Sequence, residues 1–358
     1  MMKYFEKLRA LAMFAGIVVL GVASAADVET KAQVEGRVTG NDISMDPDDP
    51  NYISNFLPEL EKTVARFPQI DPETGVHVRE VKPGLFYVTE GVYQSAFLST
   101  EEGVIVFDAP PSFAHLMPNV INQHAPGREV KYLVYSHGHN DHVGGASAFG
   151  DMEGLEIVAH AEVAKSISKS GRPGISPPTI TFTDQHRLSL GRDEIILTAA
   201  SFHAEDIDTV VYLPRQKFVI AVDTITPGDV PFMNFGATSD IGAYLTFFDM
   251  ILEYDFDHIL SGHVAILGTR EDVLEAKAYA FDVRDTVLEG MNTFLERFNT
   301  IFTQLEYQNG NLAYRAAIEE VRRECSAQII ERWKDRLSIP DVYADSHCQT
   351  FILYYIMH

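Results

Sequence analysis

The stretch LVYSHGHNDHVGG, residues 133–145, places three histidines and one aspartate within six positions, between an apolar run and two glycines. His137 and His139 lie two apart at the end of an extended run, so their side chains are expected on one side of the chain. Asp141 and His142 follow in the turn that enters the next predicted helix. Imidazoles repel each other once protonated, and they are seldom buried without partners. A cluster this dense therefore indicates a shared ligand, and metal ions are the ligand that fits.

Three residues far along the chain qualify as additional metal ligands because each follows an apolar strand. His203 stands in TAASFHAED, Asp223 ends KFVIAVD, and His263 ends DHILSGH. Ligands at strand ends lie on a rigid rim, which suits a preformed site. Together with the first cluster these donors are too many for one tetrahedral ion, so the sequence predicts two ions.

In order and spacing, HGHNDH with the later histidine, the strand-terminal aspartate and the final Gly-His resembles the metallo-β-lactamase superfamily over roughly residues 85–267. The resemblance implies an α/β fold, a four-layer αββα sandwich, here with a helical C-terminal extension. It implies one ion held by His137, His139 and His203, a second held by Asp141, His142 and His263, and Asp223 bridging the two. Two Zn²⁺ ions are expected, with Mn²⁺ or iron as alternatives that the same ligands accept. One departure is the sequence AEDID after His203, where many relatives place a glycine-containing turn.

The same resemblance implies an exported dinuclear zinc hydrolase in which a metal-bridging hydroxide, oriented by the candidate catalytic residue Asp141, cleaves an ester-like bond of a small molecule. A bridging aspartate is typical of the thioesterase, lactonase, phosphodiesterase and sulfatase-like branches. Lactones, thioesters, phosphoesters and sulfate esters are therefore expected before β-lactams. An iron-dependent sulfur or oxygen oxidoreductase on the same fold, and a metal-storing or structural protein, are the alternatives.

Two further sets of residues are candidates for contacts with the substrate. An apolar group of the substrate would suit Phe232, Met233 and Phe235, although ordinary core positions explain these side chains equally well. Three further side chains could donate to an oxyanion: Tyr93, Asn234 and Tyr244. Histidines outside the pattern are expected on the surface or in the core: His115, His124, His160, His186, His258 and His347.

The ends of the chain differ from its middle. Basic residues precede an apolar run at 10–22 and a small-residue cleavage pattern at 23–25, so residues 1–25 are predicted to be a signal peptide of a periplasmic or secreted protein. No later run approaches the roughly 20 apolar residues of a membrane span, so no stable membrane insertion is expected. The predicted parts are an N-terminal arm at 26–80 with a short helix near 58–67, the αββα domain at 81–270, and a helical extension at 271–358 packed on that domain.

The net charge bears on the class of binding partner, and the cysteine content bears on a disulfide. The formal charge of −23 repels nucleic acid phosphates, so the expected partner is a small-molecule substrate and not nucleic acid; a homodimer is a further option. Cys325 and Cys348 are the two cysteines of the chain, and export permits a disulfide between them, worth about 3 kcal/mol. Two buried free thiols are the alternative.

Short β-rich runs fall into two groups. The first comprises runs at 85–91, 93–99, 103–110 and 131–136; the second comprises runs at 155–160, 179–184, 186–190, 193–200, 208–214 and 217–223. Helices are expected at 112–124, at 241–255 and over most of 270–358, with a break at 308–311. Residues 168–179 are rich in glycine and proline and predict a loop.

Overall fold

The computed structural model describes residues 46, 48, 56–150, 152–172, 174–204 and 207–358. The predicted signal peptide and most of the predicted arm lie outside these residues. The described residues belong to one compact unit. Within the described residues, no helix is both long enough and apolar enough to cross a membrane.

The first sheet contains seven strands in sequence order, antiparallel from β1 to β4 and parallel from β4 to β7. LFYVT and GVIVF are apolar without alternation because both faces of these strands are buried. The strands are β1 (His77–Lys82), β2 (Leu85–Thr89), β3 (Gln94–Thr100), β4 (Gly103–Phe107), β5 (Val130–Val134), β6 (Glu156–His160) and β7 (Ile180–Phe182).

The second sheet has the order β12-β11-β10-β9-β8 and is antiparallel except between β11 and β12. The grouping expected from sequence is wrong for β6 and β7, which extend the first sheet. The helix α5 (Ala161–Ser170) connects these two strands, and such a crossover joins parallel neighbours. The strands of the second sheet are β8 (Gln185–Leu190), β9 (Asp193–Ala200), β10 (Asp208–Leu213), β11 (Phe218–Ile220) and β12 (His258–Leu260).

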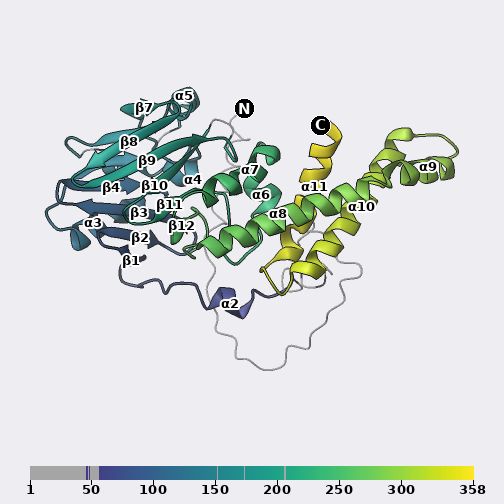
Figure 1. The fold of residues 1–358 in the computed structure, drawn as a ribbon, viewed down its shortest axis with the longest axis horizontal. Helices are drawn as coiled ribbons and strands as arrows, with labels where there is room; N and C mark the ends of the chain where they lie inside the picture. Colours follow the sequence, from purple (N-terminus) through teal and green to yellow (C-terminus); the bar gives the residue numbers. More distant parts are fainter. Residues whose placement is uncertain (1–45, 47, 49–55, 151, 173, 205–206) are drawn as a thin grey trace. The chain divides into compact units, whose positions relative to one another are not determined.

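The two sheets pack face to face, with helices on both outer faces (Figure 1). Leu98 and Ile105 of the first sheet share one core with Leu197 and Val211 of the second. Helices α3 (Met117–His124) and α5 share a core with the first sheet, while α7 (Ile241–Leu252) and the C-terminal helices share one with the second. This is the expected αββα sandwich. Shorter helices are α2 (Glu61–Val64), η3 (Ala114–Leu116), α4 (Asn140–Val143), η4 (Ala146–Phe149) and α6 (Met233–Ala237).

Residues after 269 are helical, as expected. Thr269 and Asp272 form a reciprocal cap that starts α8 (Arg270–Met291). The remaining helices are α9 (Phe294–Gln304), α10 (Gly310–Trp333) and α11 (Pro340–Met357). A disulfide between Cys325 and Cys348 joins α10 to α11, which confirms the predicted bridge.

The described part of the arm is fastened to the C-terminal extension. The Leu57 N–H donates to Asp341 Oδ2 at 2.7 Å, and the Leu60 N–H donates to Ser338 Oγ at 2.9 Å. Arg66 forms a bidentate pair with Asp272, at 2.7 Å for both bonds. Strand β1 begins at His77, inside the predicted arm, so the first sheet starts earlier than the apolar runs indicated.

Candidate metal centre

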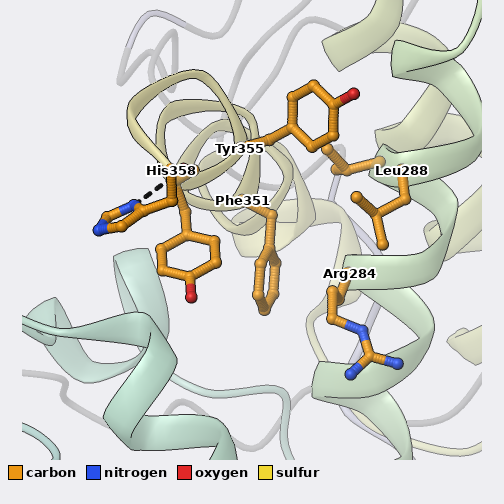
Figure 2. Close-up of a pocket in the computed structure, with 7 residues that line it drawn as sticks. Arg284, Leu288, Phe351, Tyr355 and His358 are labelled. Atoms are coloured by element: carbon orange, nitrogen blue, oxygen red, sulfur yellow. Dashed lines mark hydrogen bonds between the residues drawn. The ribbon is translucent and has the colours of Figure 1, made fainter.

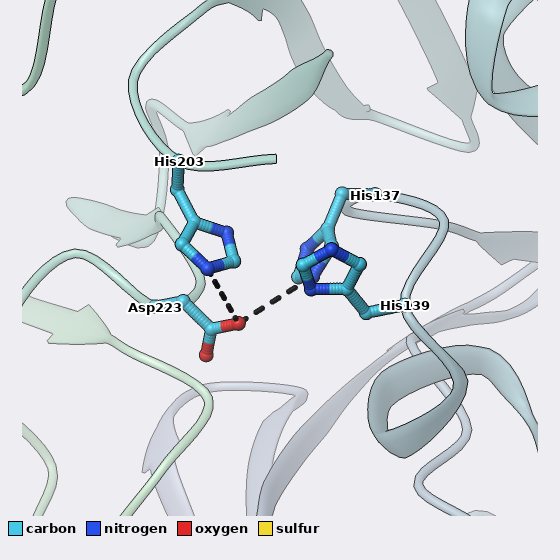
Figure 3. Close-up of side chains that lie close together, drawn as sticks. All are labelled: His137, His139, His203 and Asp223. Atoms are coloured by element: carbon cyan, nitrogen blue, oxygen red, sulfur yellow. Dashed lines mark ion pairs between the residues drawn. The ribbon is translucent and has the colours of Figure 1, made fainter. Parts of the chain in front are cut away.

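All seven predicted ligands come together at one edge of the sandwich. His137 and His139 follow β5, and Asp141 and His142 lie in α4; His203 follows β9, Asp223 follows β11 and His263 follows β12. They form two groups, in each of which the donor atoms lie within 4.8 Å of one another. The first contains His137, His139, His203 and Asp223 (Figure 3), and the second contains Asp141, His142 and His263.

Asp223 lies between the two groups. Its Oδ2 is 3.4 Å from His137 Nε2 and 3.7 Å from His203 Nε2 in the first group. The same oxygen is 3.1 Å from His142 Nε2, and Oδ1 is 3.2 Å from His263 Nε2, both in the second group. One carboxylate thus faces imidazoles of both groups, as a bridging ligand must.

The site has a buried floor and an open mouth. The side chains of His137 and His142 are fully buried, and that of Asp223 is 7% exposed. Asp141 and His263 are 40% and 37% exposed and lie 3.4 Å apart, Oδ2 to Nε2. A small molecule can therefore reach the site on the side of Asp141 and His263.

The donor set fits metal ions. His137 Nε2 and Asp223 Oδ1 are buried, and their contacts at 3.4 Å with Asp223 Oδ2 and at 3.2 Å with His263 Nε2 do not have hydrogen-bond geometry. Such atoms are costly to bury unless something else binds them. Burial lowers the pKa of His137 well below its ordinary value, which leaves the imidazole neutral. Burial alone would raise the pKa of Asp223, but neighbouring imidazoles, His142 first among them, hold it well below its ordinary value. The adjacent carboxylates outweigh burial and raise the pKa of His142, His203 and His263, so divalent cations would displace protons from these imidazoles on binding.

The Gly-His at 262–263 has a steric reason. Gly262 has φ +87°, a conformation that side chains rarely adopt. A Cβ at this position would lie 3.0 Å from His142 Cε1 and 3.3 Å from Asp223 Oδ1. The glycine therefore lets the backbone pass directly beside the ligands.

Gln94 holds the segment that carries His263, a role that the sequence did not reveal. Its buried side-chain amide donates to the carbonyls of His263 at 3.3 Å, Ile266 at 2.9 Å and Val264. Its Oε1 accepts from the N–H groups of Ser261 and Gly262 at 3.0 and 3.3 Å. A single glutamine at the start of β3 is the available signal, and it has no characteristic spacing.

Asp208 holds the turn that carries His203, also undetected from sequence. Its Oδ2 accepts from the backbone N–H groups of Phe202, His203 and Ala204 at 3.1, 2.9 and 3.2 Å. Its Oδ1 lies 3.6 Å from His203 Nδ1. The acidic run after His203 departs from the pattern of many relatives, and its last carboxylate, that of Asp208, orders this turn.

The candidates for substrate contacts differ in burial and in distance from the donors. Tyr244 is buried and its hydroxyl donates to Thr224 O at 2.7 Å, so it is not available as an oxyanion donor. Phe235 is a core residue, whereas Phe232 and Met233 are 53% and 39% exposed. Tyr93 lies beside the site, with its ring centroid 4.8 Å from that of His263. The six histidines excluded from the pattern belong to neither donor group.

A separate cavity of about 520 Å³ lies between α8 and α11 (Figure 2). None of the seven donors lines it, and its walls are mainly apolar and aromatic. The lining residues are Arg284, Val287, Leu288, Phe351, Tyr354, Tyr355 and His358. This cavity thus lies apart from the donors, and the convergence of ionisable donors makes the seven-residue cluster the candidate functional site.

The similarity of this chain to known proteins lies mainly in the sandwich. The sequence model of the metallo-β-lactamase superfamily matches residues 88–263. The 2,4-dinitroanisole O-demethylase subunit alpha of Nocardioides sp. (strain JS1661) is 26% identical over 211 residues, 57% of this chain and 62% of that protein. This chain thus spans less than two thirds of that relative.

Solved structures give the same picture of the fold. A metallo-β-lactamase from Pontibacter korlensis has a TM-score of 0.50 at 19% identity and covers 57% of this chain and 97% of its own. The stereoselective inverting sec-alkylsulfatase Pisa1 from Pseudomonas sp. has a TM-score of 0.56 at 15% identity, covering 78% of this chain and 50% of its own. The likeness to the sulfatase therefore extends beyond the sandwich, and at these identities it concerns the fold alone.

Proposed function

The chain belongs, through residues 88–263, to the metallo-β-lactamase superfamily, and from this premise we propose that it is a dinuclear metal-dependent hydrolase. Its substrate is a small molecule with an ester-like bond: a lactone, thioester, phosphoester or sulfate ester. The observation that carries the proposal is the meeting of seven donors in two groups with Asp223 between them. Zinc is the proposed metal, with manganese and iron as alternatives.

When bound, two divalent cations would ionise a water at neutral pH and polarise an oxygen of the scissile group. The side chains divide the remaining work. Asp223 and Asp141 would offset the charge of the cations, and Asp141, at the mouth, would accept a hydrogen bond from the attacking water and so orient it. His203 and His263 keep their positions during substrate entry because Asp208 and Gln94 fix their backbones.

The non-reacting part of the substrate is proposed to be apolar. Phe232 and Met233 expose apolar surface at the start of α6, in the segment that follows Asp223, and exposed apolar side chains near a site favour hydrocarbon groups. The names of the O-demethylase relative and the alkylsulfatase neighbour point to aryl and alkyl groups in those proteins. An aryl methyl ether and a secondary alkyl sulfate therefore join the substrate panel.

The test begins with metal analysis of the purified protein, followed by turnover of lactones, thioesters, β-lactams, aryl phosphates, sulfate esters and the aryl ether. We expect two zinc ions per chain and hydrolysis of one of the ester classes. Iron with oxygen consumption would replace the hydrolase by an oxidoreductase. Tight metal binding without turnover would support storage or structure.

His139→Ala tests the centre itself. We expect lower metal content and loss of hydrolysis in a folded protein, because one donor of the first group is removed. His115→Ala is the matched control, since His115 is exposed and belongs to neither group. Full activity of a folded His139→Ala protein would remove this histidine from the site.

We also propose that the protein is exported and that its mature form starts near Ala26. The basic, apolar and small-residue order of residues 1–25 supports this, as does the disulfide, which an oxidising compartment preserves. Mass spectrometry of the protein from a bacterial periplasm or medium tests the cleavage site. An intact N-terminus in the cytoplasm would contradict the proposal.

A further inference from the structure

A strained turn lies directly against the metal ligands. Four consecutive residues, 234–237, have φ between +54° and +73°, and three of them are not glycine. Non-glycine residues rarely adopt left-handed conformations because of steric strain, so neighbouring groups must hold such a turn in place. At its centre, a Cβ on Gly236 would lie 2.8 Å from the backbone oxygen of Asp223 and 3.8 Å from His203 Cδ2.

The turn is connected to the ligand strands on one side. The Ser239 N–H donates to His203 O at 3.0 Å, and Thr238 Oγ1 donates to Phe202 O at 2.6 Å. A shift of the turn would therefore move the backbone that carries His203. Because Gly236 packs on Asp223 O, the same shift would disturb the carboxylate between the two donor groups.

Helix α11 holds the turn from the other side. The Asn234 N–H donates to Ser346 Oγ at 3.1 Å, and the Thr350 hydroxyl shares its proton between Ser346 O at 2.9 Å and Asn234 Oδ1 at 3.3 Å. The Phe235 ring packs on His347, with ring centroids 4.3 Å apart. His347 Nε2 lies 3.1 Å from Phe232 O, the carbonyl that also accepts from the Gly236 N–H.

The partners of His347 define its tautomer. A carbonyl can only accept, so Nε2 carries the proton and donates to Phe232 O, while Nδ1 accepts from the Tyr279 hydroxyl at 2.8 Å. The side chain is fully buried, and burial lowers its pKa to about 4, so it stays neutral at ordinary pH. The imidazole is thus a permanent hydrogen-bond link between α8, α11 and the loop.

We propose that His347 is a positioning residue of the metal centre: from α11 it holds the turn at 234–237 against Asp223 and His203, and so sets the affinity of the site for metal. This role rests on the proposed metal-dependent function. It also gives the C-terminal extension a part in the site although the extension supplies no ligand.

The test is metal affinity, measured by titration of the stripped full-length protein with Zn²⁺ against a chromophoric chelator, and by the visible absorption spectrum of the Co²⁺ form. His347→Leu removes both hydrogen bonds. We expect affinity to fall about tenfold or more, as for other residues that orient metal ligands, and the Co²⁺ spectrum to change. His347→Gln keeps a donor near Phe232 O and should restore much of the affinity.

Tyr279→Phe is the matched control. It removes the hydrogen bond on the far side of the same imidazole and leaves the bond to Phe232 O intact. We expect a lower melting temperature with wild-type affinity. If His347→Leu does not fold, Ser346→Ala, which removes the acceptor of the Asn234 N–H, must still weaken metal binding.

Two results overturn the inference. One is wild-type affinity and spectrum in a folded His347→Leu or Ser346→Ala protein. The other is an equal loss of affinity in Tyr279→Phe, which would trace the effect to stability alone. If the wild-type protein itself binds no metal, the proposed function fails, and this outcome is distinct from both.

Discussion

The sandwich and the C-terminal extension contribute to the candidate metal centre in opposite ways. The sandwich supplies every donor, each placed just after a strand or in the short helix α4. The extension supplies none, yet α11 contacts the turn that packs on Asp223 and His203. Donors are therefore readable as a motif, whereas the groups that hold them are distributed over the whole compact unit.

This division between donors and supporting groups predicts how strongly a substitution should affect metal binding. A change in a donor removes a metal ligand outright. A change in a supporting side chain alters the position of a ligand that is still present, so its effect should be smaller and graded. A change at the junction of arm, sandwich and extension should alter stability and leave metal binding as it is.

Asp223→Ala should have the largest effect. Because Asp223 faces imidazoles of both groups, its loss should reduce the metal content from two ions to one or fewer and lower hydrolysis by about a hundredfold or more. Elemental analysis and steady-state kinetics measure both. Asp255→Ala is the control, since Asp255 is an exposed partner of Lys217. Two ions bound with unchanged affinity would show that Asp223 does not bridge.

Asp208→Asn should have an intermediate effect within the sandwich. The amide keeps one acceptor oxygen but loses the charge that three backbone N–H groups share, so the turn that carries His203 should loosen. We expect zinc affinity to fall about 10- to 100-fold with the fold retained. Chelator competition and circular dichroism test this.

A control for this change lies on the neighbouring strand β9, whose last residue, Ala200, pairs with Asp208. Asp193 is also buried, at the opposite end of β9, where it accepts from Gln216 Nε2 at 2.8 Å. Asp193→Asn should affect stability and leave zinc affinity unchanged. Equal affinities of the two variants would mean that Asp208 contributes to folding only.

Sequence predicted the donors but not their supports, for a physical reason. A ligand motif such as HGHNDH is local, and apolar runs before His203, Asp223 and His263 reveal strand ends without knowledge of pairing. The Gln94 and His347 contacts join residues more than 100 positions apart, and they exist only once the chain has folded. Neither composition nor local spacing distinguishes such residues in the sequence.

The sheet assignment failed for a related reason. The apolar pattern located β6 and β7 correctly as strands, but pairing depends on connections and not on the strands themselves. Helix α5 lies at Ala161–Ser170, where the sequence predicts no helix, and the glycine- and proline-rich residues 168–179 predict a loop, so the crossover between parallel neighbours is not evident from the sequence. The disulfide was predictable because the chain has two cysteines and therefore one pairing.

The junction of arm, sandwich and extension should show the smallest effect, and one that depends on pH. Asp229 is buried where the loop after β11 meets Ser338, and Glu59 and Arg66 of the arm face it. Burial, followed by the charge of Glu59, raises the pKa of Asp229 from 3.8 to about 7. The folded state thus favours the protonated acid, while the unfolded state ionises near its ordinary value.

The sign follows from proton uptake. Between pH 3.8 and about 7 the folded state binds the extra proton, so the free energy of unfolding decreases as the pH rises and then stays constant above pH 7. Asp229→Asn removes this ionisation. We therefore expect the free energy of unfolding of the variant, relative to that of wild type, to increase by on the order of 1 kcal/mol or more between pH 4 and pH 8.

Chemical denaturation of the metal-stripped proteins at both pH values measures this difference. Titration of the seven donors affects variant and wild type equally, so it cancels when the two proteins are compared. If variant and wild type differ in unfolding free energy by the same amount at both pH values, Asp229 ionises near its ordinary pKa. If the variant has an altered zinc affinity, the junction also contributes to the metal centre.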